Sequence, residues 1–520
     1  MRGTRASQRL SRALASAISI ALASLAFAPR SSAQDAPLQG FDAYVAEALK
    51  AWQVPGCAVA VVKDDRVVLA QGYGVRTAGK SDPVGPETLF AIASNSKAFT
   101  ATAIAMLVAE GKLGWNDLVT ERWPGFRMMD WEATRRMKVI DLLCHRSGLG
   151  TWAGDLMWFG SKLTRAEVVE RIRYVPPAFD YGTGYGYSNL MFVVAGELIP
   201  RVDGRSWEQF LLERLFQPLG MTRTNTSVAS LAGDPDVATP HTLVRGPLEQ
   251  VPYLDVSNSG PAGAINSCAK DLASWLRFQL AEGRVDGQKL VPASAIEMLR
   301  IPQNLRVVSP FARSLNPSTH LAAYALGFEV ADYQGRLKVE HTGGLNGMYS
   351  IVALIPEAEL GVAVVTNLDE HDLTHALALH VIDAYLGVPA QDWSQRYLKA
   401  KRGQNAERAA AARRGVSKRV PNTRPSHEPK DYTGTFANQL YGEAVVAIEG
   451  DKMTLRLSQH ANTGVLSHWH YDVFLATWDD VVWHESAVRF ETDIEGRIGA
   501  LSLKIRPEWI DPLEYRFERN

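Results

Sequence analysis

Cysteine is scarce in this chain of 520 residues. The three cysteines, Cys57, Cys144 and Cys268, lie far apart and form no C-x-x-C pair. Three scattered cysteines exclude a disulfide framework and a cysteine-rich zinc site. Whether Cys144 and Cys268 pair with each other is left open by the sequence.

An excess of either charge and long apolar runs are also missing. The chain has 55 Lys and Arg against 56 Asp and Glu, for a formal net charge of -1. Near-neutrality and the lack of low-complexity tracts argue against a nucleic-acid-binding surface and against a disordered chain. No segment reaches the roughly 20 apolar residues that span a membrane, so we expect no stable membrane anchor. With 46% hydrophobic residues the chain can bury a large core and form more than one domain.

The N-terminus has the three parts of a secretory signal peptide. Four arginines precede an apolar run, residues 13–27, and the small residues Ser31, Ser32 and Ala33 follow. We therefore expect residues 1–33 to be a signal peptide, cleaved near Ala33, and the mature protein to be periplasmic or secreted. Removal of residues 1–33 takes away five arginines and no acid, which leaves 50 basic against 56 acidic residues.

The next region, residues 34–390, has strand patterns at both ends and helix patterns between them. Two β-branched runs, 57–63 and 66–72, flank the Asp64-Asp65 turn and predict a β-hairpin. The Ala- and Leu-rich segment 98–113 predicts a buried helix. Further helices are expected at 166–174, 207–216, 270–282 and 371–387, and strands at 324–330, 337–341, 350–355 and 361–365. This order predicts an α/β (α+β) fold, with an antiparallel sheet closed by the two ends of the domain and flanked by helices.

Two shorter regions follow the large one. Residues 391–430 are rich in Lys and Arg and end in a proline-rich stretch. A basic run can bind nucleic acid or an anionic surface, but a solvated linker helix is the simpler interpretation. Residues 431–520 carry short alternating runs at 443–448, 452–457 and 497–504, which predict a small all-β sandwich or barrel.

One motif at the start of the buried helix can carry chemistry. Ser94-Asn95-Ser96-Lys97 places a lysine one helical turn from a serine hydroxyl. A buried lysine with a lowered pKa can accept the serine proton, and N–H groups at the helix start can stabilise developing negative charge. A second match, Ser267-Cys268-Ala269-Lys270, is interpreted as an accidental one in which Ser267 caps a helix.

Two further motifs distinguish the first match from the second. Tyr187-Ser188-Asn189 lies in a Gly/Tyr loop before an apolar helix, and His341-Thr342-Gly343-Gly344 ends a late strand. In this order the three motifs resemble the active site of the serine β-lactamase and penicillin-binding protein superfamily. The sequence segments 142–149, 215–221 and 324–328 are similar to segments of class C β-lactamases, D-aminopeptidases and related esterases. The resemblance covers about residues 40–390 and implies a serine β-lactamase-like fold, followed by a lipocalin-like C-terminal barrel.

The resemblance also implies a mechanism. Ser94 would attack a carbonyl carbon and form an acyl-enzyme, which water then hydrolyses, with no metal or organic cofactor. Lys97 and Tyr187 would manage the proton, the tyrosine acting as a base only if nearby positive charge lowers its pKa. The oxyanion hole would consist of the backbone N–H groups of Ser94 and Gly344, the latter on an edge strand. The implied substrate-binding residues are Asn189, His341 and Gly343, with Asn189 also bonded to Lys97.

One departure from the superfamily pattern bears on the substrate. β-Lactamases and transpeptidases usually have K-T-G where this chain has His341-Thr342-Gly343. A lysine there suits a substrate carboxylate, whereas histidine is mostly neutral at pH 7. The H-x-G pattern resembles D-aminopeptidase-like peptidases, some of which have a C-terminal β-barrel. We therefore expect a peptidase or amidase that acts on short or linear peptides, including peptides with D-residues.

Other functions compete with this one. A carboxylesterase, and a β-lactamase or penicillin-binding protein, would use the same serine. A protein that is acylated once and stops would be a ligand-binding or β-lactam-sensing protein. His468-Trp469-His470-Tyr471-Asp472 begins like the zinc motif of metallo-β-lactamases, but Val473 follows it, and two histidines on one face of a strand explain the pattern more simply. Neither H-E-x-x-H nor G-x-S-x-G occurs. The sequence does not indicate the oligomeric state.

Overall fold

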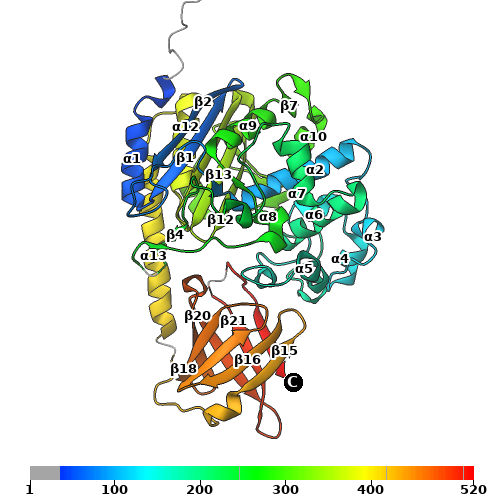
Figure 1. Cartoon of the computed structure of the whole chain (residues 1–520), viewed down its shortest axis with the longest axis vertical. Coiled ribbons are helices and arrows are strands. Elements are labelled where there is room, and N and C mark those ends of the chain that lie inside the picture. The colour runs from blue at the N-terminus through cyan, green and yellow to red at the C-terminus, as the bar shows by residue number, and fades with distance from the viewer. Residues whose placement is uncertain (1–35, 245, 417–418, 507–508) are drawn as a thin grey trace, which may run out of the picture. The chain divides into compact units, whose positions relative to one another are not determined.

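A large antiparallel sheet grows from the predicted hairpin. In the computed structural model, which describes residues 36–244, 246–416, 419–506 and 509–520, its strands run in the order β2-β1-β14-β13-β12-β11-β10-β9 (Figure 1). The strands are β1 Gly56–Lys63, β2 Arg66–Gly74, β9 Asn304–Arg306, β10 Ala322–Tyr324, β11 Glu329–Tyr333, β12 Arg336–Leu345, β13 Met348–Ile355 and β14 Leu360–Thr366. The predicted signal peptide, residues 1–33 with its cleavage point at Ala33, lies outside the described residues, and the segment up to Gln39 is a unit separate from Gly40–Asn520.

The two ends of the domain pair with each other inside this sheet, one strand in from its β2 edge, as the predicted closure of the sheet requires. β1 pairs with β14 from Cys57 opposite Thr366 to Lys63 opposite Leu360. Both strands are buried almost throughout, because helices cover both faces of the sheet. Asp64 and Asp65 have φ angles of 51° and 58°, which is the left-handed geometry of a tight two-residue hairpin turn.

Helices cover the sheet and fill the other half of the domain. Helix α9 packs on β1, β2 and β14, whereas α12 packs on β13 and β14, and α1 packs on β2 and α12 (Figure 1). The helices are α1 Phe41–Trp52, α2 Ser96–Ala109, α3 Val119–Arg122, α4 Trp131–Arg136, α5 Arg165–Arg171, α6 Asn189–Asp203, α7 Trp207–Leu211, α8 Gly260–Gly263, α9 Ala269–Leu280, α10 Ala293–Met298, α11 Pro310–Leu315, α12 Leu373–Leu386 and α13 Trp393–Val416. Short strands pair as β3 Phe90–Ala91 with β6 Asn266–Ser267, β4 His241–Thr242 with β5 Glu249–Gln250, and β7 Arg284–Val285 with β8 Gln288–Lys289.

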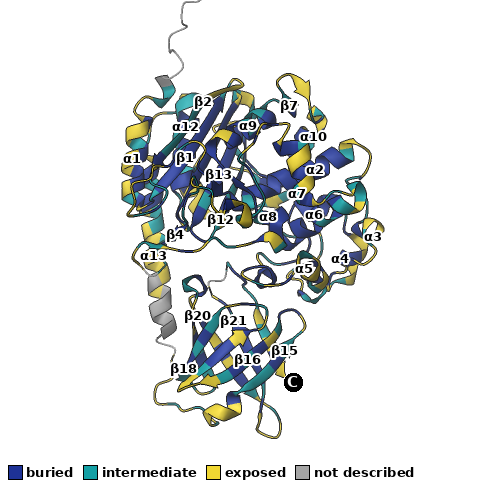
Figure 2. Ribbon diagram, viewed as in Figure 1, coloured by how far each residue is buried: buried dark blue, intermediate teal, exposed yellow. Residues whose placement is uncertain are grey.

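Helix α2 is the buried helix that the sequence predicted. Its residues are buried without interruption from Ser96 to Leu107 (Figure 2). A helix that is apolar all round has no solvent-facing side and belongs in the core. Phe99 stacks on Trp275 of α9 with 3.8 Å between ring centroids, which fixes α2 against the rest of the domain.

One predicted strand is wrong. Residues 324–330 do not form a single strand, because β10 ends at Tyr324 and β11 begins at Glu329. Between them Gly327 has a φ of 75°, and a Cβ there would lie 2.7 Å from the carbonyl oxygen of Lys97. The turn is buried against α2, so it is built from apolar residues and its sequence looks like that of a strand.

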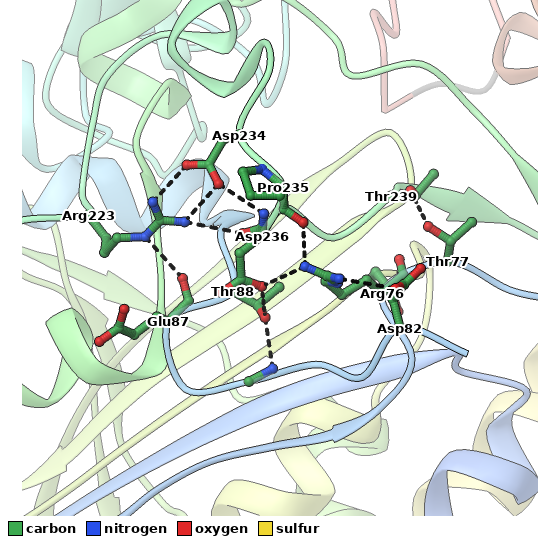
Figure 3. Close-up of polar contacts among 12 residues, drawn as sticks. Arg76, Thr77, Asp82, Glu87, Thr88, Arg223, Asp234, Pro235, Asp236 and Thr239 are labelled. Atoms are coloured by element: carbon green, nitrogen blue, oxygen red, sulfur yellow. Dashed lines mark hydrogen bonds and ion pairs between the residues drawn. The ribbon is translucent and has the colours of Figure 1, made fainter. Parts of the chain in front are cut away.

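An arginine and aspartate network holds the segment that leads to Ser94. Arg223 binds both carboxylate oxygens of Asp234, at 2.7 and 3.1 Å, and Arg76 binds Asp236 at 3.1 Å (Figure 3). Thr88 donates its hydroxyl to the Asp236 carboxylate at 2.6 Å. The loop around Asp234 is thereby tied to the residues just before β3, and β3 runs into the Ser94 turn.

The C-terminal region is a closed barrel, which resolves the predicted choice between sandwich and barrel. Its strands pair in sequence order from β15 to β22, and β22 pairs back with β15. They are β15 Gly434–Asn438, β16 Gly442–Glu449, β17 Lys452–Leu457, β18 Thr463–His470, β19 Val473–Trp478, β20 Glu485–Thr492, β21 Ile498–Lys504 and β22 Glu514–Arg519. Tyr432, Phe474 and Phe490 pack against one another in its core.

The first two turns of α13 pack one face on the large domain, so this part of the basic segment is not a fully solvated linker. Trp393 is buried and donates its indole N–H to Asp383 at 2.8 Å. Ser394 accepts a hydrogen bond from the indole of Trp52 at 3.0 Å, and Tyr397 and Leu398 are buried as well. The first turns of helix α13 therefore belong to the large domain. The basic composition of the segment gave no sign of this packing.

Cys57, Cys144 and Cys268 are buried free thiols, so Cys144 and Cys268 are not paired. Within the described ranges, no helix combines the length and apolar character that crossing a membrane requires.

Candidate active site

Ser94 lies on a strained turn between β3 and α2. The short helix η2, Ala93–Asn95, precedes α2, and Ala93 has a φ of 49°, in the left-handed region that alanine rarely adopts. Ser94 is partly exposed, whereas its neighbours Ala93 and Asn95 are buried. The strained turn thus presents one hydroxyl at the surface of a buried structure.

Strand β12 lies directly against this turn. A Cβ at Gly343 would be 2.0 Å from the carbonyl oxygen of Ile92, so only glycine fits there. Ser350 on β13 donates its hydroxyl to the same Ile92 oxygen at 2.8 Å and accepts from the Asn95 amide at 2.8 Å. These contacts set the distance between the His341-Thr342-Gly343 strand and Ser94.

Lys97 is buried and points at Ser94. Its Nζ lies 3.1 Å from Ser94 Oγ, 2.7 Å from Asn189 Oδ1 and 2.9 Å from the carbonyl oxygen of Ala262. Burial lowers the pKa of Lys97 to about 7, although the negative charge of Asp155 acts in the opposite direction. A large share of Lys97 is therefore a neutral amine near pH 7, and a neutral amine can accept the Ser94 proton.

Tyr187 does not meet the condition that would make it a base. Lys97 Nζ lies 4.8 Å from the centre of its ring, but burial raises the pKa of Tyr187 well above its usual range. The phenol is protonated at neutral pH and can donate a proton. Of the two groups, only Lys97 has a pKa that leaves part of it in the basic, neutral form near pH 7.

Asn189 is held by a residue that sequence reasoning missed. Its Nδ2 donates to Asp155 Oδ2 at 2.6 Å, while its Oδ1 accepts from Lys97. Asp155 is buried, and burial raises the pKa of its carboxyl to about 8. The hydrogen bond fixes which way the Asn189 amide points. No local sequence signal marks Asp155, because its contact with Asn189 arises only from the fold.

His341 is neutral, and both of its ring nitrogens already have hydrogen-bond partners. Its Nδ1 donates to the carbonyl oxygen of Thr342 at 2.6 Å, so its Nε2 accepts from the Tyr324 hydroxyl at 2.8 Å. Burial and the charge of Lys97 lower the pKa of His341 to about 3. Tyr324 lies in the segment 324–328, which resembles the family, but the sequence did not indicate that its hydroxyl is the hydrogen-bond partner of His341.

The family follows from a direct comparison. The sequence model described as Beta-lactamase matches residues 41–386. The chain belongs to the Beta-lactamase family. A second model, described as a domain of unknown function (DUF3471), matches residues 418–519. The three sequence motifs of this β-lactamase-family chain lie in the first match and the barrel lies in the second.

The chain is also similar to several known proteins. "Unguisins hydrolase ungD'" of Aspergillus campestris is 30% identical over 449 residues, which is 82% of this chain and 80% of that protein. "Protein flp" of Staphylococcus aureus is 26% identical over 64% of this chain and 63% of its own length. The octameric penicillin-binding protein homologue from Pyrococcus abyssi shares the fold with a TM-score of 0.60 and 22% identity, over 92% of this chain and 99% of that one. A structure of SurE matches with a TM-score of 0.55 and 21% identity, over 94% and 100% of the two chains.

β12 is an inner strand of this β-lactamase-family sheet, which corrects the expectation of an edge strand for Gly344. It pairs with β13 along its second half and with β11 along its first half. The pairing with β11 stops at Glu340, so on that side the strand from His341 to Leu345 is unpaired among the described residues. Gly344 lies on this locally free side, and it lines the same cavities as Ser94.

Two cavities meet at Ser94. The smaller one, of about 80 Å³, is lined by Asn189, Asp155 and several aromatic side chains. The larger one, of about 540 Å³, is lined by Tyr187, His341, Gly344 and a group of charged residues. Trp509, which follows the barrel strand β21, lines both. The structure therefore brings together Ser94, Lys97, Tyr187, Asn189, His341, Gly343 and Gly344, while their roles in a reaction stay predictions.

The second serine and lysine pair lies elsewhere and is not a helix cap. Ser267 is on strand β6, and its hydroxyl bonds to Thr224 Oγ1 at 2.8 Å. Helix α9 starts after it, at Ala269, with Cys268 at the cap position. Lys270 is exposed and pairs with Glu87 at 2.6 Å, so the two motif residues have separate partners.

The two histidines of the zinc-like pattern also have separate partners. His468 Nε2 bonds to the carbonyl oxygen of Tyr471, and His470 Nδ1 accepts from the backbone N–H of Val420. Among the described residues, no three His, Cys, Asp or Glu side chains come together as a metal site.

Proposed function

We propose that this chain is an exported serine hydrolase that cleaves amide bonds in short or linear peptides, including peptides with D-residues, through an acyl-enzyme on Ser94. The observation that carries the proposal is the contact of 3.1 Å between Lys97 Nζ and Ser94 Oγ, made by a lysine whose pKa burial lowers to about 7. A serine beside a neutral amine is an activated nucleophile. Export rests on the N-terminal sequence alone.

The first half of the reaction transfers the acyl group to Ser94. The Ser94 proton moves to Lys97 Nζ as Oγ attacks the carbonyl carbon. The oxyanion then accepts hydrogen bonds from the backbone N–H groups of Ser94 and Gly344. When the intermediate collapses, the C–N bond breaks and the leaving amine takes a proton from the Lys97 and Tyr187 pair.

The second half restores the enzyme. Water takes the place of the amine, Lys97 accepts its proton, and the hydroxide adds to the acyl carbon. Ser94 leaves with that proton, and the free acid is released. Asn189 holds Lys97 and is available to the substrate amide, and Asp155 keeps the Asn189 side chain in the required orientation.

Two observations support a peptide substrate over a β-lactam. His341 is neutral, so the strand carries no fixed cation at the position where β-lactamases have lysine. A relative of 30% identity is named as a hydrolase of unguisins. The larger cavity, of about 540 Å³, has room for a short peptide.

The test is turnover of three substrates by the purified protein. A peptide p-nitroanilide, a chromogenic ester and a penicillin are each incubated with the wild type and with Ser94→Ala. The proposal expects the p-nitroanilide to be hydrolysed with many turnovers, and only by the wild type. Cleavage of the ester alone would instead identify a carboxylesterase, rapid penicillin turnover a β-lactamase, and a lasting stoichiometric adduct a sensor.

A further inference from the structure

Helix α13 contributes a cation, the ammonium of Lys401, to the wall of the active-site cavity. Lys401 is half-buried and lines the same cavity of about 540 Å³ as Ser94. Among the described residues, no hydrogen bond or ion pair joins its ammonium to another group. Its charge nevertheless acts on His371, another residue of the cavity wall. Burial is the main cause of the lowered pKa of His371, and the positive charge of Lys401 is the second cause. Lys401 lies beyond the part of the chain that matches the Beta-lactamase family.

The packing of α13 determines where this ammonium lies. Tyr397 and Leu398 are buried against the domain, and Asn316 donates to the Tyr397 hydroxyl at 3.4 Å. Lys401 follows these two residues by four and three positions, so it lies on the same face of the helix. Lys399, two positions earlier, is exposed and does not line the cavity.

Most other charges in the cavity are already partnered. Arg306 forms an ion pair with Glu329, and Glu370 accepts from the indole of Trp509 at 3.0 Å and lies 4.0 Å from Arg408. Asp369 accepts from Gly347 N–H and from the Thr242 hydroxyl, each at 3.0 Å.

Asp372 is the remaining carboxylate of the cavity wall. An ion pair requires 4.0 Å or less between nitrogen and oxygen, and within the described part of the chain no such pair joins Asp372 to Lys401. His341 is neutral, so it adds no positive charge to the cavity. Among the cations that line the cavity, Lys401 is the one that forms no ion pair with a described carboxylate.

We propose that Lys401 binds a carboxylate of the substrate and makes the enzyme prefer anionic peptides over their uncharged analogues. The inference rests on the proposed function, since it names a feature of the substrate of that same site. A half-buried ammonium interacts with a carboxylate more strongly than an exposed one does, because less water screens the pair. It would supply the positive charge that the His341-Thr342-Gly343 strand lacks.

The experiment compares substrates that differ only in one charge. One pair carries an N-succinyl or an N-acetyl group on the same alanine derivative, and a second pair carries a carboxylate or a carboxamide on the leaving group. Each pair is prepared as the amide and as the ester, and kcat and KM are measured for the wild type, Lys401→Gln, Lys401→Arg and Lys399→Gln in the full chain. Asp372→Asn is included as a control for the neighbouring carboxylate.

The proposal expects the wild type to prefer the carboxylate member of at least one pair. Lys401→Gln should raise KM for that member about tenfold, which corresponds to 1.4 kcal/mol, and leave its kcat and the uncharged member nearly unchanged. Lys401→Arg should keep most of the preference, Lys399→Gln should keep all of it, and added salt should weaken it.

Other results separate two kinds of failure. Equal KM values within both pairs, or a preference that Lys401→Gln does not remove, would overturn the role of Lys401 while leaving the peptidase intact. An equal loss on charged and uncharged members, reversed when Asp372→Asn is added, would make Lys401 a counter-ion of Asp372. Cleavage of the esters alone would overturn the peptidase, and the ester pairs would still test Lys401.

Discussion

At the scale of the residue, the central feature is a lysine placed where water cannot stabilise its charge. Lys97 has three oxygen neighbours, but burial still lowers its pKa to about 7. The Tyr187 pKa moves in the opposite direction, because burial disfavours the charged form of each group. The same physical cause therefore leaves part of Lys97 as a neutral amine and keeps Tyr187 as a protonated phenol near pH 7.

The pH dependence of catalysis tests this assignment. Lys97 must be neutral to accept the Ser94 proton, so kcat/KM should fall as the pH drops through about 7 and level off above it. Lys97→Arg should lose at least about a hundredfold in kcat, because a guanidinium stays protonated at these pH values. A profile measured from pH 5 to 9 with a substrate that does not titrate gives the answer. Activity that stays constant down to pH 5 would contradict a lysine base.

At the scale of the element, the site depends on how closely β12 approaches the Ser94 turn. Gly343→Ala would place a methyl group 2.0 Å from the Ile92 carbonyl oxygen and push the strand away from Ser94. We expect a stability loss of about 1–3 kcal/mol and a larger loss in kcat/KM than stability alone explains, because the oxyanion donors move apart.

Gly403→Ala is the matched control for that substitution. Nothing lies within 4 Å of a Cβ at Gly403 on α13, so stability and activity should stay the same or rise slightly. Melting temperature and kcat/KM are measured for both variants. Full activity in Gly343→Ala would show that the close approach is not required.

Local patterns predicted the elements that local forces determine. The hairpin at Asp64-Asp65, helix α2 and the barrel strands were predictable because periodicity and turn residues mark them. The turn at Gly327 was not, because burial against α2 replaces the usual polar turn residues with apolar ones. Ser94 and Lys97 lie three positions apart in the chain, on the turn before α2 and in its first turn, so a local pattern marks them. Asp155 and Lys401, by contrast, reach the site through contacts between distant segments, which carry no local pattern.

At the scale of the whole molecule, the barrel contributes to the active-site cavity. Trp509 lines both cavities at Ser94 and donates its indole N–H to Glu370 at 3.0 Å. Asp511 accepts from the backbone N–H of Leu156 at 3.3 Å, next to Asp155. The domain of unknown function therefore contributes to the cavity wall, and we expect it to limit substrate length.

Trp509→Ala tests that role in the full chain without removing the barrel. Loss of the indole opens the cavity, so the ratio of kcat/KM for a hexapeptide to that for a dipeptide should rise about tenfold or more. Trp131→Ala, a change at an exposed tryptophan of α4, is the matched control. An unchanged ratio in Trp509→Ala would remove the barrel from substrate selection.

The central claim is that Ser94 is the nucleophile, and intact-mass measurement after reaction with an acylating substrate tests it most directly. The wild type and Ser267→Ala should each gain the mass of one acyl group, because Ser267 is bonded to Thr224 and its motif lysine pairs with Glu87. Ser94→Ala should gain none and should have no hydrolase activity. An acyl group of the same mass on Ser94→Ala would contradict the account.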